Sequence, residues 1–128
     1  MSQSKPRFDI SASVVRQLGE DLITDEVTAL ITQIEFIDVL ESAPDAETLE
    51  KRIEQDKKDS EAHYQLSAHY ILQGRIEEAL DQLLQIVMYD RAYNDDAGKN
   101  GLLKLFTLLG NTHPLVNKYR RKLAMVLN

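Results

Sequence analysis

From residue 25 to its end, this chain is a series of amphipathic helical stretches divided by short breaks. Apolar residues recur at steps of three and four, the spacing that places side chains on one face of a helix. No window has the sustained two-residue alternation of a strand, and no hairpin-type turn dipeptide separates the apolar runs. Because short connections favour antiparallel neighbours, the pattern predicts an all-α fold of stacked antiparallel helical hairpins in a right-handed superhelix.

The breaks between these stretches carry the residues that begin and end helices. Asp45 is suited to cap one helix, either Asp59 or Ser60 the next, and Pro114 suits the first turn of the last one. Gly74 and Gly110 are expected to end helices. The core face of the first stretch, over residues 25–42, is expected at Val27, Leu30, Ile31, Ile34, Ile37 and Leu40.

Length and composition limit the possible function. The 128 residues fit one domain, and the absence of cysteine excludes thiolate catalysis and cysteine-ligated zinc. No ordered catalytic set or metal-ligand spacing is present, so we expect neither an enzyme nor a cofactor. No apolar run approaches the roughly 20 residues of a membrane helix, and residues 1–9 lack the apolar stretch of a signal peptide. We therefore expect a cytoplasmic location and no membrane association.

Charge is distributed unevenly along the chain. Residues 1–90 hold 19 acidic against 8 basic residues, whereas residues 91–128 hold 2 against 7. The net charge of −6 disfavours nucleic acid as a partner, because such binding depends on neutralising phosphates. The basic end is suited instead to an acidic protein surface.

The stretch over residues 60–91 has a more specific spacing than general amphipathicity. Ser67 and Ala79 are small residues that let two helices approach, and Tyr70 and Leu83 are large ones that fill the gaps. This order resembles a tetratricopeptide repeat, with a departure at His63, where the pattern often has Trp. Residues 102–127 resemble a weaker, capping unit. The expected packing residues are Leu66, Ser67, Tyr70, Gly74, Ala79, Leu83 and Ile86.

A narrower resemblance appears when the tail is included. Residues 74–84, 90–91, 108–110, 114–116 and 119–123, in this order, are similar to the C-terminal region of chaperedoxins, the bacterial thioredoxin and tetratricopeptide fusion proteins. The resemblance implies a co-chaperone that docks on an Hsp60-type chaperonin through its last helix and holds unfolded client proteins. Redox activity is not expected, because the chain has neither a thioredoxin domain nor a cysteine.

The first 30 residues do not follow that family. Residues 8–20 and 23–30 are similar to the opening helices of Hsp90-like and histidine-kinase-type ATPase domains, although the Glu and Asn that such domains need on the next helix are missing. An accidental resemblance of a helical extension is the alternative. We therefore expect a helical N-terminal extension of different origin over residues 1–31 and a tetratricopeptide-like domain over residues 32–128.

The last helix is the expected partner-binding site. It contains four cations and no acidic residue between His113 and Asn128. Cations near a helix C-terminus are also stabilised by the helix dipole, so a purely structural role is the simpler alternative. A generic tetratricopeptide scaffold, or a self-associating homo-oligomer, is the alternative function. The expected contact residues are Tyr119, Arg120, Arg121, Lys122, Leu123, Met125, Val126 and Leu127.

Overall fold

A computed structural model describes residues 25–128, and every regular element in that range is a helix. The predicted all-α class is therefore confirmed. Most of the proposed N-terminal extension and its ATPase-like stretch lie outside the described residues. The helices are α2 (Asp25–Leu40), α3 (Ala46–Gln55), α4 (Ser60–Leu72), α5 (Ile76–Tyr89), α6 (Tyr93–Leu109) and α7 (Pro114–Leu127).

The predicted helix caps are present. An oxygen of Asp45 accepts a hydrogen bond from the backbone N–H of Thr48 at 2.9 Å and begins α3. Asp59 does the same for the N–H of Ala62 at 3.1 Å and begins α4. Each carboxylate satisfies a donor that the first turn leaves free. Gly74 ends the α4 hairpin turn at a φ of 80°, a conformation that suits glycine.

Helix α6 begins irregularly. Asn94, Asp95 and Asp96 all have positive φ, between 48° and 62°, so its regular part starts at Ala97. These polar residues tolerate the left-handed region better than most, which fits their place at a break in the sequence pattern. The side chain of Asp90, just before this break, accepts a hydrogen bond from the Ser60 hydroxyl at 3.0 Å and ties the start of α4 to the end of α5.

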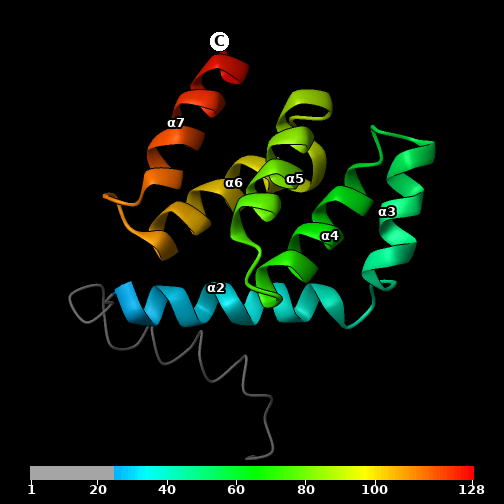
Figure 1. Cartoon of the computed structure of the whole chain (residues 1–128), viewed down its shortest axis with the longest axis horizontal. Coiled ribbons are helices and arrows are strands. Elements are labelled where there is room, and N and C mark those ends of the chain that lie inside the picture. The colour runs from blue at the N-terminus through cyan, green and yellow to red at the C-terminus, as the bar shows by residue number, and fades with distance from the viewer. Residues whose placement is uncertain (1–24) are drawn as a thin grey trace, which may run out of the picture.

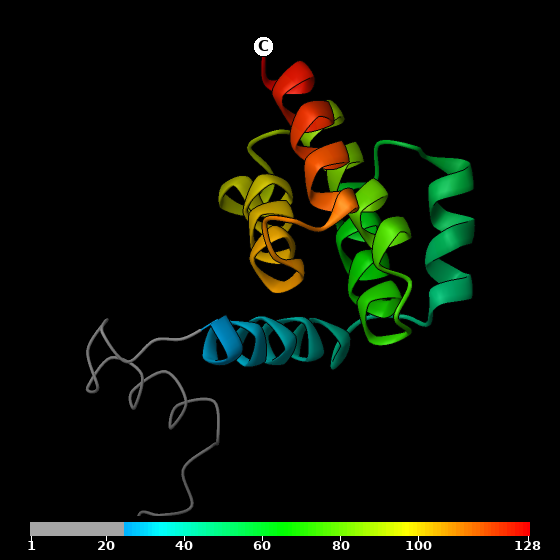
Figure 2. The same ribbon diagram turned by 60° about the vertical axis from the view of Figure 1, so that its left-hand side comes forward.

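The helices form a stack of hairpins with one crossing helix (Figure 1). Helix α4 packs against α5, α5 against α6, and α7 against both α5 and α6, while α3 lies on the outside of α4. Helix α2 contacts α4 and α6 and does not pair with α3, its neighbour in sequence. The turned view in Figure 2 shows α2 crossing beneath the other helices. The predicted stack of helical hairpins is thus present, with α2 as an added layer.

The predicted core face of α2 is wrong at Leu30 and Ile37, whereas Leu40 does pack against the core. Leu30 is 59% exposed and Ile37 is 44% exposed, whereas Thr32 and Phe36 on another side of the helix are buried. Phe36 lies with its ring centroid 6.1 Å from that of Tyr64 on α4. Because α2 is apolar on more than one side, its periodicity does not determine which side is buried. The buried side is determined by packing of the large aromatic ring against α4.

The central hairpin is built by the residues that the repeat spacing singled out. Six of them have almost no exposed surface, and the small Ser67 and Ala79 lie fully buried in the core shared by α4 and α5. The Ser67 hydroxyl is satisfied by donating to the backbone oxygen of Tyr64 at 2.6 Å. These buried residues are Leu66, Ser67, Tyr70, Ala79, Leu83 and Ile86.

Helices α5 and α6 approach each other at two glycines that the sequence analysis did not single out. A Cβ at position 98 would lie 2.9 Å from the Cβ of Ile86 and 3.1 Å from the backbone oxygen of Leu83. A Cβ at Gly101 would meet only the terminal methyl groups of Leu83, the nearest at 3.0 Å. The second hairpin therefore uses glycine where the first uses serine and alanine.

Candidate protein-interaction surface on α7

Helix α7 is anchored by one apolar face. The helix begins at Pro114, and the Nδ1 atom of His113 accepts a hydrogen bond from the backbone N–H of Leu115 at 3.1 Å. Val116, Tyr119 and Leu123 then follow at helical spacing and are buried in the core shared with α5 and α6. This face closes the stack, so it is not available to a partner while the domain is folded.

Polar contacts of Tyr119 and Lys118 join α7 to α5. The Tyr119 hydroxyl donates a hydrogen bond to Asp81, and the ammonium of Lys118 lies 2.6 Å from a carboxylate oxygen of Glu77. Burial and the bond to Asp81 raise the pKa of the Tyr119 phenol well above its usual value. The hydrogen bond from Lys118 lowers the pKa of Glu77 below its model-peptide value of 4.5. The charge of Lys118 is thus neutralised within the domain.

The opposite side of α7 is exposed and cationic. The Arg121 side chain has no hydrogen bond or ion pair with any residue in 25–128. Arg120 donates to the Asn111 side chain at 2.7 Å and forms no ion pair with a carboxylate in residues 25–128. Lys122 is half-buried and lies over the Tyr119 ring at 4.8 Å, and its charge adds to the effect of Lys118 in lowering the pKa of Glu77. The apolar side chain of Met125 is 77% exposed on the same side of α7. We call Asn117, Arg120, Arg121, Lys122 and Met125 the α7 surface.

The eight residues predicted to contact a partner divide between the two sides of α7. Tyr119 and Leu123 are buried and hold the helix to the domain. Val126 and Leu127 are half-buried at its end. The remaining four lie on the α7 surface, where Arg120, Arg121 and Met125 are exposed and Lys122 is half-buried.

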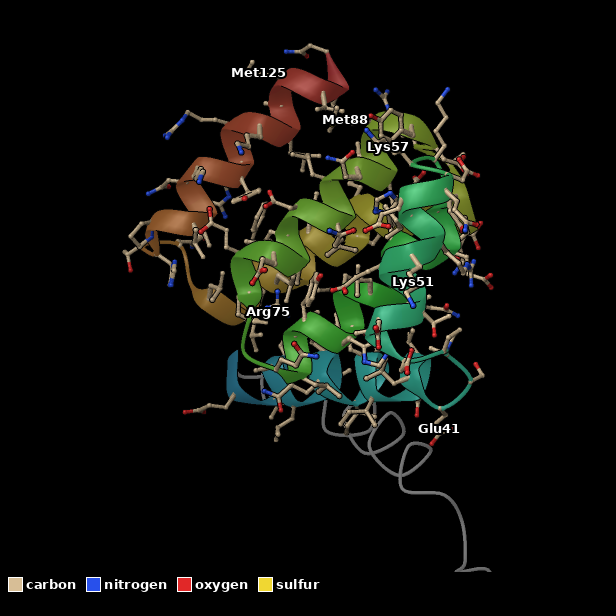
Figure 3. All side chains as sticks on the ribbon, turned by 45° about the vertical axis from the view of Figure 1, so that its right-hand side comes forward. Glu41, Lys51, Lys57, Arg75, Met88 and Met125 are labelled. Atoms are coloured by element: carbon tan, nitrogen blue, oxygen red, sulfur yellow. The ribbon has the colours of Figure 1, made fainter. Side chains whose placement is uncertain are left out.

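One apolar contributor at this end of the molecule was missed. Met88, in the last turn of α5, is 49% exposed, and Figure 3 shows it at the same end of the molecule as Met125. The two helix ends are joined by Arg91, which donates a hydrogen bond to the backbone oxygen of Val126 at 3.0 Å. Sequence spacing could not have found Met88, because it continues the row of Leu80 and Leu84 on α5 and its position relative to α7 depends on the tertiary structure. Methionine side chains adapt their shape to varied apolar surfaces.

Comparison with known protein families decides the class of the fold. A model of the tetratricopeptide repeat matches residues 40–128. The chain belongs to the tetratricopeptide repeat family. No curated protein and no solved structure matches the chain significantly.

Tetratricopeptide domains are non-catalytic scaffolds for protein partners, and such arrays offer their partners extended surfaces formed by successive repeats. In this tetratricopeptide domain, the surface formed by α4 and α6, which we call the α4/α6 face, is covered by α2. Phe36 is buried there, and Lys104 of α6 lies 2.7 Å from Glu35 of α2. The α4/α6 face is therefore occupied by the chain itself.

The tetratricopeptide domain also has a pocket of about 450 Å³ between α3 and α5. His63 lies at its base, with Nε2 donating to the backbone oxygen of Lys57 at 2.8 Å and Nδ1 lying 2.6 Å from Gln82. His69 is also used internally, at 2.8 Å from the backbone oxygen of Pro44. Within residues 25–128, no group of three or more His, Asp or Glu residues is arranged to hold a metal ion.

None of the described helices is long and apolar enough to cross a bilayer.

Proposed function

We propose that this tetratricopeptide domain is a protein-interaction module of a co-chaperone, which docks on an Hsp60-type chaperonin through the α7 surface. The observation that carries the proposal is the division of α7 into a buried side and a cationic, methionine-bearing outer side. The resemblance of residues 74–123 to the C-terminal region of chaperedoxins supports the choice of partner.

The α7 surface combines two kinds of recognition. Arg120 and Arg121 form no ion pair within residues 25–128, so their charges are available to an acidic partner. Complementary charge raises the rate of encounter and fixes orientation more than it adds affinity. Met125, and Met88 at the same end of the molecule, supply apolar contact, which is the larger source of binding free energy.

Holding of unfolded clients is a second part of the co-chaperone hypothesis, and it has less support. A client needs an exposed apolar surface, and the α4/α6 face is covered by α2. We therefore restrict the proposal to docking. A generic scaffold without a chaperonin role is the competing function, and it predicts no preference for this partner.

Point substitutions on the α7 surface are the appropriate test. Deletion of α7 would uncover the core, because Tyr119 and Leu123 are buried, and loss of binding would then have no clear cause. We suggest measuring chaperonin binding by interferometry for the wild-type chain and for Arg121→Glu. The control is Lys51→Glu, which reverses an exposed charge on α3, far from α7 (Figure 3).

We expect Arg121→Glu to slow association severalfold and to reduce the dependence of the rate on salt, because charge on an interface rim acts mainly on encounter. Lys51→Glu should bind as the wild type does. Equal binding by all three chains would contradict docking through α7, and absence of binding by the wild type would contradict the choice of partner.

A further inference from the structure

Helices α3 and α5 border a pocket on the side of the domain that α2 leaves uncovered. Both helices pack on α4, and they do not pack against each other. We call the pocket of about 450 Å³ between them the α3/α5 pocket. A pocket that combines apolar walls with a few polar groups is the usual form of a binding site. It is lined from α3 by Ile53 and Glu54, and from α5 by Asp81, Gln82, Gln85 and Tyr89.

The charge of the α3/α5 pocket favours a cationic occupant. Glu54 is exposed and forms no ion pair within residues 25–128. Asp81 accepts a hydrogen bond from Tyr119 of α7 and lies close enough to Lys118 for their charges to interact. Lys57, just after α3, contributes the opposite charge to the lining. Helices α3 and α5 together hold six acidic residues against two basic ones, so the wider surface around the pocket is acidic.

The α7 surface has the complementary charge. Helix α7 holds four basic residues and no acidic one. Arg121 follows the buried Tyr119 by two positions, or about 200° around the helix, so it points away from α5 of its own chain. In Figures 1 and 2, α5 lies between α3 and α7, and these two helices do not contact each other. Arg121 therefore faces away from the pocket of its own molecule, and it can reach the pocket of a second one.

We propose that the α7 surface of one copy of this chain docks in the α3/α5 pocket of another. Arg121 then lies near Glu54. Met125, one turn further along α7, contacts Ile53 and Tyr89, and methionine packs well on an aromatic ring. Charge selects this pairing, because two α7 surfaces would bring cations together and two pockets would bring carboxylates together. The contact joins two different surfaces, so it is heterologous.

This self-association and chaperonin docking use the same α7 surface and exclude each other. The self-association does not rest on the proposed docking function, and it is measured without a chaperonin. A chain that self-associates and does not bind the chaperonin would contradict only the docking function. A chain that binds the chaperonin and stays monomeric would contradict only the self-association.

Sedimentation velocity over a range of protein concentrations tests the proposal. We expect the wild type to self-associate, and to do so more strongly at low salt. Arg121→Glu and Glu54→Lys should each weaken the association severalfold, since each replaces an attraction with a repulsion. The double variant exchanges the two charges and should recover most of the association. A wild type that stays monomeric at every concentration, or single variants that associate as the wild type does, would overturn the proposal.

Arg121→Glu combined with Glu26→Lys is the matched control. It has the same net charge as the exchanged pair, but Glu26 is an exposed residue of α2 and does not line the pocket. This control should associate as weakly as Arg121→Glu alone. Recovery by the control would show that net charge, and not the pocket, governs association, and the proposal would then fail.

A spin label locates the contact between the two molecules. Ala124→Cys is exposed beside Met125 and is the single thiol in the chain, so it can carry a nitroxide. This chain, at natural isotope abundance, is mixed with isotope-labelled chain that has no nitroxide. The side-chain amide signals of Gln82 and Gln85 should broaden, whereas the signals of α2 should stay sharp. Broadening confined to α7 would indicate pairing of two α7 surfaces and would overturn the proposal, as would sharp signals throughout.

Discussion

Substitution of Gly98 by alanine tests the close approach of α5 and α6. The added Cβ would lie 2.9 Å from the Cβ and Cγ2 atoms of Ile86 and 3.1 Å from the backbone oxygen of Leu83. None of these atoms is the far end of a flexible side chain, so the two helices must separate. Overpacking of this kind costs about 1–3 kcal/mol, and the better helix propensity of alanine offsets about 0.5–1 kcal/mol.

Gly101→Ala is the matched control on the same helix. Its Cβ would meet the Cδ2 and Cδ1 atoms of Leu83 at 3.0 and 3.1 Å, and these methyl groups can rotate away. The steric cost therefore falls to about 1 kcal/mol and is nearly offset by helix propensity. We expect Gly98→Ala to be destabilised by about 1–2 kcal/mol and Gly101→Ala to be close to neutral.

Urea unfolding followed by circular dichroism at the helical minimum measures this difference. With a dependence of about 1–3 kcal/mol per molar urea, the midpoint of Gly98→Ala should fall by about 0.5–1 M. The midpoint of Gly101→Ala should stay within error of the wild type. The account of this helix crossing is wrong if Gly98→Ala is as stable as the wild type, or if Gly101→Ala is the less stable of the two.

Two further predictions concern α2 and α7. Phe36→Ala should lower the free energy of unfolding by about 3–5 kcal/mol in the same urea assay, because the ring is buried. The control Glu26→Ala removes an exposed side chain and should stay within about 0.5 kcal/mol of the wild type. Equal effects of the two substitutions would contradict the buried face of α2. For α7, Lys118 lowers the folded-state pKa of Glu77, so this contact stabilises the fold above the ordinary pKa of 4.5 and is lost as the pH falls through the folded-state value. Glu77→Gln should therefore be less stable than the wild type at pH 7, and the urea midpoints of the two proteins should converge near pH 3; a constant difference between them would refute the assignment.

The central hairpin was predictable because its signals are local. Asp59 caps α4, Gly74 ends the turn, and the small Ser67 and Ala79 lie fully buried in the shared core. Each of these roles depends on residues close in sequence, so the spacing alone defines the hairpin.

The position of α2 was not predictable from local signals. The helix is apolar on more than one side, and its contacts come from α4 and from α6, including the ion pair between Glu35 and Lys104, which lie 69 positions apart. The periodicity predicted that the row containing Leu30 and Ile37 faces the core, whereas in the structure Phe36 is the buried residue. Such a choice depends on tertiary contacts that sequence spacing does not specify.

The candidate site was found only in part. The cluster of cations identified α7, but the predicted contact residues included Tyr119 and Leu123, which are buried. At about 100° per residue, a helical wheel separates these two from Arg121 and Met125, so the signal was present in the sequence. Met88 comes from another helix, and its nearness to the end of α7 follows from the tertiary structure.

Site-specific cross-linking tests the central claim, docking through the outer side of α7, most directly. A benzophenone attached to Met125→Cys, the single thiol in the chain, should cross-link to an Hsp60-type chaperonin under ultraviolet light, since position 125 is 77% exposed on the α7 surface. The same probe on Lys51→Cys should give no cross-link. Cross-linking only from position 51, or with equal yield from both positions, would contradict the account.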